Sequence, residues 1–305
     1  MHVLIVGGAG MIGGHAALHL KSEGHQVTIA GRRRPESIPV LASFPFIKGD
    51  YVKEEFTKDH LSPFDAIVFA AGADVRHCPE GEDKDEYLLE ANGVAVPRFA
   101  ALARSAGVKT FVHIGSVYMH ILPADVVEST AYIRSRKLAA EGVANLSNET
   151  FKATSLDPPI VVGTVPGMDI PFFQASVQYA EGKFPIPPSA PQGGLNFISV
   201  QSLSEAIDGA LRNPSEVAGR TILIGDENLT YAQYFDKFFQ EVGHKEGAVK
   251  AVDGDHPMLP RWSLYAGERT VTYETDPKDW KSLGEFRRND VNRAIKEVVK
   301  QYRSS

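Results

Sequence analysis

Three glycines at a fixed spacing, directly after an apolar run, are the feature that most limits what this chain can fold into. The chain opens with MHVLIVGGAGMIGGHAALHLKSEGHQVTIAGRRR, in which Gly7, Gly10 and Gly13 form a GxxGxxG pattern. Glycines so placed permit a tight turn, close approach of a phosphate to the backbone, and close packing of helix on strand. A strand at 2–7 followed by a helix at 11–23 therefore predicts a dinucleotide site at a helix N-terminus, the alternative being a merely structural turn.

Short apolar runs rich in β-branched residues recur along the chain and predict its fold class. They lie at residues 2–7, 26–30, 44–48, 66–71, 110–114 and 221–224. Helix-like stretches such as 11–23 and 87–106 separate most of them. Alternating strands and helices imply right-handed crossovers and a parallel sheet buried on both faces. We therefore predict an α/β fold, a doubly wound parallel sheet of the Rossmann type, with a smaller substrate-binding lobe.

The end of the second predicted strand indicates which dinucleotide is bound. A site selective for NAD places a carboxylate there, where it accepts hydrogen bonds from the ribose 2′-hydroxyl. This chain instead reads Ala-Gly-Arg-Arg-Arg at 30–34, with no carboxylate. A guanidinium pairs well with phosphate, so Arg32 and Arg33 predict NADP(H), whose 2′-phosphate they would contact. The alternative is a solvated basic loop.

A change of composition after residue 162 suggests how the chain is divided. Residues 163–195 are crowded with proline, glycine and aromatic residues, which predicts an irregular region that covers a substrate. Residues 196–224 return to a strand, helix and strand pattern. We assign 1–162 and 196–226 to an NADP-binding Rossmann domain, and 163–195 and 227–305 to a substrate-binding lobe.

Bulk properties exclude several classes of function. The 305 residues carry a formal net charge of -6, so there is no basic field for nucleic acid. No apolar run approaches the roughly 20 residues of a membrane span. Cys78 is the single cysteine, and the histidines near it, His60 and His77, show no metal-ligand spacing, so we expect neither a disulfide nor a metal. Met1 leads directly into a strand pattern without a signal segment, and we expect a cytoplasmic protein.

Several segments together resemble the extended short-chain dehydrogenase/reductase superfamily, in the group of NAD-dependent epimerase/dehydratase and hydroxysteroid or dihydroflavonol reductase relatives. They are GGAGMIG at 7–13, KGD at 48–50, FAAG at 69–72, EANGVAVPRFAALARSAGVKTFVHIGS at 90–116, PPIVVG at 158–163 and NFISVQSLSEAIDGAL at 196–211. The resemblance covers most of residues 1–240. With the two arginines, it implies a cofactor-binding set of Gly7, Gly10, Met11, Ile12, Gly13, Arg32, Arg33, Asp50, Tyr51, Ala70, Ala71, Gly72, Asn92, Lys137 and Pro159.

The resemblance also implies a catalytic tyrosine, with a lysine four residues later that lowers its pKa and holds the nicotinamide ribose. This chain has STAYIRSRKLAAE, in which Lys137 follows Tyr132 by five residues and Arg136 follows it by four. On a regular helix, five residues place two side chains about 140° apart. A one-residue π-bulge would bring Tyr132 and Lys137 together, and Arg136 would otherwise supply the positive charge. The alternative for Tyr132 is a packing or substrate-contact role.

The family's substrate-binding serine has one natural candidate in the segment HIGSVYMHI. Ser116 fits that position, with Tyr118 as a neighbour that would enter the site, although a structural hydroxyl at a strand end is the alternative. The flanking His113 and His120 are interpreted as packed or surface residues. The predicted catalytic residues are therefore Ser116, Tyr132, Arg136 and Lys137.

Three functions remain open on these residues. The first is an NADP(H)-dependent oxidoreductase acting on the carbonyl or alcohol of a small, partly apolar metabolite. The second is an epimerase or lyase of the same superfamily that retains its cofactor. Residues 164–195 contain no arginine and only Lys183, which disfavours a nucleotide-sugar substrate. The third is a non-catalytic NADP-binding sensor or scaffold. The superfamily resemblance further implies a homodimer formed through the helices predicted at about 87–106 and 131–146.

Overall fold

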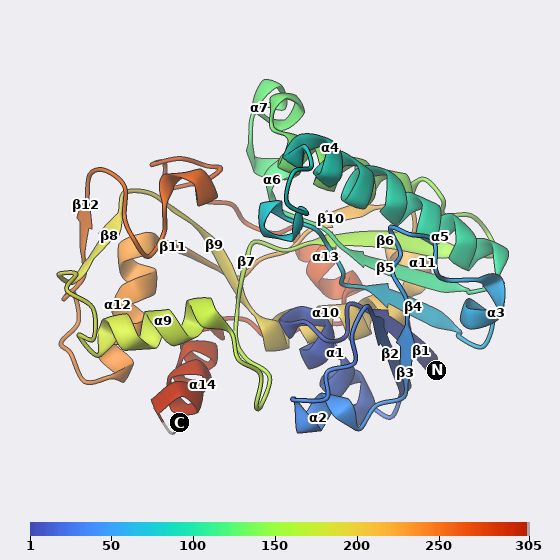
Figure 1. Cartoon of the computed structure of the whole chain (residues 1–305), viewed down its shortest axis with the longest axis horizontal. Helices are drawn as coiled ribbons and strands as arrows, with labels where there is room; N and C mark the ends of the chain where they lie inside the picture. The colour runs from blue at the N-terminus through green and yellow to red at the C-terminus, as the bar shows by residue number, and fades with distance from the viewer. Residues whose placement is uncertain (304–305) are drawn as a thin grey trace. The chain divides into compact units, whose positions relative to one another are not determined.

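The computed structural model describes residues 1–303 and consists of two compact units (Figure 1). The first unit comprises Met1–Pro158, Leu203–Ile224 and Asp276–Phe286. The second comprises Pro159–Ser202, Gly225–Thr275 and the chain from Arg287 onward.

The first unit is built on a seven-stranded sheet in which every pairing is parallel. The strand order is β3-β2-β1-β4-β5-β6-β10, so the direction of winding reverses between β1 and β4. A reversal of this kind is where doubly wound sheets bind their ligands, outside the carboxyl ends of the strands. The predicted fold class is confirmed. The strands are β1 (His2–Val6), β2 (Gln26–Gly31), β3 (Phe46–Lys48), β4 (Ala66–Phe69), β5 (Thr110–Ile114), β6 (Lys152–Asp157) and β10 (Thr221–Leu223).

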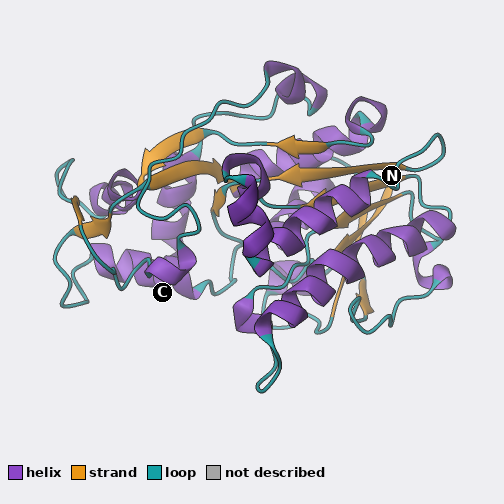
Figure 2. Ribbon diagram, turned by 90° about the horizontal axis from the view of Figure 1, so that it is seen from above, coloured by secondary structure: helices purple, strands orange, loops and turns teal. Residues whose placement is uncertain are grey.

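Helices cover both faces of this sheet (Figure 2), and Figure 1 shows α1 and α10 on one face and α5 on the other. The longer helices of the unit are α1 (Met11–Ser22), α5 (Ala95–Ser105), α8 (Ala131–Ala144) and α10 (Val200–Arg212), of which α10 begins in the second unit. The shorter ones are α2 (Pro39–Ala42), α3 (Lys58–Leu61), α4 (Lys84–Leu88), α6 (Tyr118–Ile121), α7 (Ala124–Ser129), α11 (Pro214–Val217), α13 (Pro277–Ser282) and the 3-10 helix η1 (Val75–His77).

The segment predicted as one helix at 87–106 is interrupted. It consists of the end of α4, a π-helix η2 (Leu89–Val94) and α5. A π-helix is rare and accommodates one extra residue per turn, which a hydrophobic pattern alone does not reveal.

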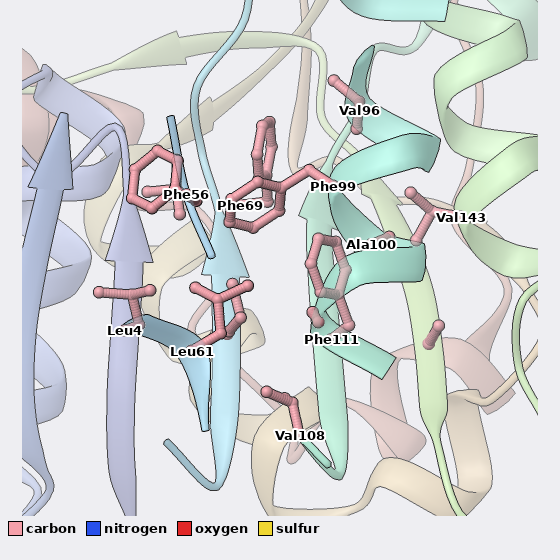
Figure 3. Packing of buried hydrophobic residues seen from close by; sticks show 14 of the residues in the cluster. Leu4, Phe56, Leu61, Phe69, Val96, Phe99, Ala100, Val108, Phe111 and Val143 are labelled. Carbon is pink, nitrogen blue, oxygen red and sulfur yellow. The ribbon is translucent and has the colours of Figure 1, made fainter. Parts of the chain in front are cut away.

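Aromatic side chains fill the space between the sheet and α5 (Figure 3). The ring of Phe99 on α5 lies 5.2 Å from the rings of both Phe56 and Phe69, measured between centroids. Phe111 on β5 lies 6.0 Å from Phe69. Aromatic pairs at these separations stabilise a core beyond the area they bury. This core fixes β4 and β5, whose carboxyl ends carry the candidate site.

The second unit contains two small sheets and three α-helices among its described residues. One sheet has the order β11-β9-β7 and the other pairs β12 with β8. The elements are β7 (Ile160–Val162), α9 (Pro171–Ala180), β8 (Ser189–Pro191), β9 (Gly194–Ser199), β11 (Glu227–Thr230), α12 (Tyr231–Glu241), β12 (Lys250–Val252), the 3-10 helix η3 (Arg261–Ser263) and α14 (Val291–Arg303).

Two expectations about this part of the chain differ from the structure. Residues 163–195 were expected to be irregular, yet they contain the ten-residue helix α9 and the strand β8. Pro171 lies in the first turn of α9, where no backbone donor is required, and Phe173 and Val177 are buried on one face. Residues 196–226 were grouped with the large sheet; Leu203–Ile224, with β10, do belong to the first unit, whereas β9 pairs with β7 and β11 in the second. The assignment of cofactor and substrate to separate parts of the chain stays a prediction.

Candidate functional site

The three glycines of the opening motif have three different surroundings. Gly7 follows β1 with a φ of +85°, and a Cβ there would lie 2.6 Å from the backbone nitrogen of Ala71. A Cβ on Gly13 would overlap the carbonyl oxygen of Gly7. Gly10 is different, because its Cβ would meet only that same oxygen, at an ordinary 3.5 Å. Two glycines therefore serve the turn and the packing of α1 on β1, while Gly10 is exposed and leaves room for a group from outside the chain.

The N-terminus of α1 lies at this open position. Gly10 is the residue before the helix, and no side chain caps the end of α1. The first turn, which contains Met11 and Ile12, carries no acidic residue. An uncapped helix N-terminus presents unpaired N–H groups and a partial positive charge, which suit a pyrophosphate. The surroundings of Gly10 and this helix end thus fit a dinucleotide.

The segment after β4 lies on the other side of the strand reversal. Ala70 donates its N–H to the carbonyl of Val6, so Ala70, Ala71 and Gly72 continue from the strand next to β1. A Cβ on Gly72 would lie 2.6 Å from Nη1 of Arg136. The absence of a side chain at residue 72 therefore lets the guanidinium of Arg136 reach the carboxyl end of β4.

The predicted adenine-side residues are near one another at the carboxyl ends of β2 and β3. Asp50 accepts a hydrogen bond from the N–H of Val52 at 3.0 Å, which holds the loop after β3. Burial raises the pKa of the Tyr51 hydroxyl to about 12. The positive charges of Arg136 and Arg32 oppose this rise, and the negative charge of Asp50 adds to it. The Tyr51 ring packs edge-on against Phe69 of β4, 5.0 Å between centroids. Arg32, Asp50, Tyr51 and Arg136 therefore share one electrostatic neighbourhood.

Arg32 and Arg33 are exposed at the end of β2, and neither forms an ion pair with another part of the chain within residues 1–303. The third arginine of the run is used differently. Arg34 donates to the carbonyl oxygens of Ala42 and Phe44 at 3.1 and 3.3 Å, so it holds the loop around α2. Only the first two guanidinium groups are thus available to an external phosphate.

Asn92 is fully buried and its amide is used within the chain. Its Oδ1 accepts from the N–H of Ala73 at 2.9 Å, and its Nδ2 donates to the Ala73 carbonyl at 3.0 Å and to Oγ of Ser135 at 3.1 Å. The residue lies in the π-helix η2. Asn92 therefore ties the segment after β4 to α8, and its contact with the cofactor stays a prediction.

The geometry of helix α8 determines whether Arg136 or Lys137 lies on the same helical face as Tyr132. It is α-helical from Ala131 to Ala144, so the bulge that would bring Lys137 beside Tyr132 does not form. The amine of Lys137 pairs with Glu128 at 3.2 Å and Glu141 at 3.4 Å on the outer side of the helix. Arg136, four residues after Tyr132 and thus on the same face, is buried. The structure brings Tyr132 and Arg136 to the same side and leaves Lys137 apart.

The inward side chains of α8 make specific contacts. Nη2 of Arg136 donates to the carbonyl oxygens of Ile114 and Gly115 at 2.6 and 3.0 Å, which fixes the chain leaving β5. Tyr132 packs against Ala73, Leu88 and Ala91. Ser116 follows immediately after Gly115 and is 8% exposed. Arg136 thus links β4, β5 and α8 at their shared end.

One polar cluster beside Ser116 was not predicted. The carboxylate of Asp157, at the end of β6, accepts from Nε2 of His120 at 2.7 Å. Its other oxygen, Oδ1, accepts from Oγ of Ser155 at 2.6 Å, and the Ser155 Oγ is in turn 2.9 Å from Nδ1 of His113. A carboxyl group at the carboxyl end of a buried strand is the sequence signal that would have pointed to this cluster.

The remaining predictions of this group concern Pro159, metals and membranes. Pro159 is buried just before β7 and lies in the second unit. The described residues contain no cluster of three or more histidine, cysteine or acidic residues suited to a metal. None of their helices has the length and apolarity needed to cross a bilayer.

Comparisons with known proteins agree with this geometry. A model described as the NAD dependent epimerase/dehydratase family matches residues 3–225. The UDP-glucose 4-epimerase of Klebsiella pneumoniae is 28% identical over 132 residues, covering 39% of this chain and 92% of that protein. UDP-arabinose 4-epimerase 1 of Arabidopsis thaliana is 29% identical over 181 residues, covering 51% of this chain and only 41% of the relative.

Solved structures share the fold over the full length. UDP-glucuronic acid 4-epimerase from Bacillus cereus, in complex with NAD, has a TM-score of 0.74 at 16% identity, covering 100% of this chain and 99% of that one. UDP-glucose-4-epimerase from Stenotrophomonas maltophila, with bound NAD and formylated UDP-arabinopyranose, has a TM-score of 0.73 at 19% identity, covering 100% and 98%.

Proposed function

The chain belongs to the NAD dependent epimerase/dehydratase family, and from that membership we propose that it is an enzyme using a nicotinamide dinucleotide to oxidise and re-reduce a carbinol carbon of a small-molecule substrate. The observation that carries the proposal is the contrast among the glycines, since Gly7 and Gly13 are required by the fold while Gly10 leaves space at an uncapped helix end. When bound, the nicotinamide accepts a hydride from the substrate or returns it.

The residues of α8 supply the proton chemistry in this proposal. Tyr132 exchanges a proton with the substrate oxygen, as general acid or base. Arg136, on the same helical face, supplies fixed positive charge, and its hydrogen bonds to the carbonyls of Ile114 and Gly115 hold the segment that carries Ser116. Ser116 then binds the substrate oxygen. Lys137 takes no part, because Glu128 and Glu141 hold its amine on the outer side of the helix.

For the cofactor we propose NADP(H), although the two solved relatives above are described with NAD. Arg32 and Arg33 stand where an NAD-selective site needs a carboxylate, and both are exposed at the end of β2. Each charge-assisted hydrogen bond to the 2′-phosphate contributes roughly 1.5 to 3 kcal/mol, or about one to two decades of affinity.

The cofactor preference is tested by thermal shift with NADP(H) and NAD(H) at matched concentrations, since a ligand raises the unfolding temperature by mass action. We expect a larger shift with NADP(H), and loss of that preference in Arg32→Ala/Arg33→Ala. The control is Arg34→Ala, whose guanidinium holds the loop around α2. Equal shifts with both cofactors, or an unchanged preference in the double variant, would contradict the NADP assignment.

For the overall reaction we propose epimerisation, in which the cofactor returns to its starting redox state. Both curated relatives are 4-epimerases, which favours this outcome over net reduction. The second candidate is an NADP(H)-dependent reductase of a small, partly apolar carbonyl compound. Arg32 and Arg33 favour it, because NADPH is the common donor for net reduction.

Substrate panels of sugars, nucleotide sugars and simple ketones separate the two reactions. Epimerisation gives an isomeric product at one equivalent of cofactor or less, with no lasting change in absorbance at 340 nm. Net reduction consumes NADPH in proportion to product. A protein that binds the cofactor and converts nothing in the panel would favour a non-catalytic sensor.

A further inference from the structure

A chain of four hydrogen-bonding side chains crosses the carboxyl ends of β5 and β6. His113 contacts Ser155 at 2.9 Å, Ser155 contacts Asp157 at 2.6 Å, and Asp157 contacts His120 at 2.7 Å. His113, Ser155 and Asp157 are fully buried, whereas the His120 side chain is 20% exposed. The chain therefore begins in the interior of the first unit and ends at a histidine that solvent reaches.

The direction of each hydrogen bond follows from what each group is able to donate. An ionised carboxylate only accepts, so Ser155 donates to Asp157 and must itself accept from Nδ1 of His113. Burial, aided by the charge of Arg136, holds the pKa of His113 well below its usual range, so this ring is neutral. His120 likewise must place its proton on Nε2 to donate to Asp157.

The second ring nitrogen of His120 is the chemically interesting one. With the proton on Nε2, Nδ1 of a neutral ring carries a lone pair and is basic. Within residues 1–303, no hydrogen bond to that nitrogen is formed. A carboxylate behind an imidazole fixes its tautomer and stabilises the imidazolium that forms when the ring takes up a proton. Asp157 stands in that relation to His120.

The local backbone is built to hold this pair. Gly115 lies against the carboxylate, and a Cβ there would overlap Oδ1 of Asp157. The N–H of Val117 donates to the carbonyl of Pro158 at 3.1 Å, joining the chain after β5 to the chain after β6. The N–H of His120 donates to the Val117 carbonyl at 2.9 Å. His120 is thereby fixed four residues after Ser116, at the sheet edge where doubly wound folds bind substrates.

Charged groups on the helices packed against α6 are committed elsewhere or exposed. On α7, Glu128 pairs with Lys137 of α8, and Asp125 is exposed. On α8, Arg134 donates to the Glu128 carbonyl at 3.3 Å, and Arg136 donates to carbonyls after β5. Asp157 is therefore the carboxylate within hydrogen-bond distance of the His120 ring.

We propose that His120 is a second proton-transfer residue of the hydride-transfer reaction proposed above, and that Asp157 is its positioning residue. In the oxidising direction, the substrate O–H bond breaks, Tyr132 takes up its proton at the substrate oxygen, and the proton passes on to Nδ1 of His120. The C–H bond of the carbon that bears this oxygen breaks, its hydride reduces the oxidised nicotinamide, and a C=O bond forms. The resulting imidazolium is paired with Asp157, and the return step reverses each transfer.

The decisive variant is His120→Gln, whose amide keeps a donor for Asp157 but does not titrate. We expect turnover to fall by about 10² to 10⁴, with cofactor affinity unchanged and an unfolding temperature close to that of the wild type. The matched control is His60→Gln, at an exposed position of α3, which should keep full turnover. In His120→Ala, added imidazoles should restore turnover, and the restored rate should rise with the basicity of the imidazole. If the His120 ring only fills space, the restored rate should not depend on basicity.

A second readout does not depend on activity. In protein labelled with ¹⁵N-histidine, ring nitrogen shifts should show His120 protonated on Nε2, and Asp157→Asn should disturb that tautomer. His120→Gln turnover within threefold of wild type, rescue that ignores basicity, or a ring protonated only on Nδ1 would each overturn the inference while leaving the proposed function intact. Wild-type protein that binds dinucleotide but transfers no hydride would reject both.

Discussion

Arg136 occupies the position that a lysine holds in the motif this chain resembles, and the difference is physical. A lysine is a compact charge with rotatable donors, whereas a guanidinium is a planar fork. Here Nη2 already donates to the carbonyls of Ile114 and Gly115. Arg136 therefore holds the backbone beside Ser116, and Arg136→Lys is not a conservative replacement.

At the level of single residues, Tyr132→Phe should remove a proton donor without changing the packing of the ring against Ala73, Leu88 and Ala91. We expect turnover to fall by roughly 10² to 10⁴, with cofactor affinity nearly unchanged. Lys137→Ala should lower turnover less than threefold, because its amine is engaged with Glu128 and Glu141 and takes no part in the reaction. Loss of these exposed ion pairs should lower stability by about 1 kcal/mol or less. Steady-state kinetics of both variants check this. A severe defect in Lys137→Ala together with an active Tyr132→Phe would reverse the assignment.

The sequence predicted the candidate catalytic residues Ser116, Tyr132, Arg136 and Lys137 but not their register. A shift of one residue decides whether Arg136 or Lys137 lies on the same helical face as Tyr132. That choice depends on α8 being regular, which no local pattern determines. His120 was interpreted as a packed or surface residue because its partner Asp157 is 37 residues away, and only the parallel pairing of β5 with β6 brings them together.

At the level of elements, strand β6 was missed and the large sheet was still predicted correctly. The sequence KATSLD has few apolar residues, yet its side chains from Ala153 to Asp157 are buried. Polar side chains are tolerated there because they bond to one another and to the backbone, as Thr154 does to the Arg220 carbonyl at 3.0 Å. Helix α9 was missed for a different reason, since proline and glycine dominate its neighbourhood while its own buried face is short.

Two substitutions in the turn between β1 and α1 test separately which glycine the fold needs and which one cofactor binding needs. Gly13→Ala places a methyl group against the Gly7 carbonyl, and overpacking of this kind costs about 1 to 3 kcal/mol. Gly10→Ala meets no such obstacle in the free protein. Replacing a glycine at the helix N-cap lowers stability, whereas a less flexible unfolded chain raises it. Each effect is about 1 kcal/mol or less, so they nearly cancel. We therefore expect the unfolding temperature without cofactor to fall only in Gly13→Ala.

Cofactor titration completes that comparison. If a pyrophosphate lies against Gly10, Gly10→Ala should weaken dinucleotide binding at least tenfold while the free protein keeps its stability. Differential scanning calorimetry and fluorescence titration measure the two quantities separately. A Gly10→Ala protein with normal affinity would show that the turn serves the fold alone.

At the level of the whole molecule, two large apolar side chains are exposed on neighbouring elements. Val94 at the end of η2 is 49% exposed and Leu138 on α8 is 43% exposed. Leu138 lies next to the residue that precedes Val94, because a Cβ on Gly93 would lie 3.2 Å from the Leu138 side chain, and we treat the two exposed side chains as one patch. The patch lies on the helices through which the sequence predicts a homodimer, and apolar groups at the centre of an interface contribute most of its affinity.

A charge placed in that patch is the sharpest test of the dimer. In Leu138→Glu, association of two copies would bury two unpaired carboxylates, and a buried unpaired charge costs about 3 kcal/mol or more, so dimer affinity should fall at least 100-fold. Analytical ultracentrifugation should show the wild type as a dimer at micromolar concentration and the variant as a monomer. Trp262→Glu is the matched control, because Trp262 is 64% exposed and belongs to the second unit, whereas these helices belong to the first, and it should leave the dimer intact. A monomeric wild type would reject the homodimer, whereas a dimer that survives Leu138→Glu would place the interface on another surface.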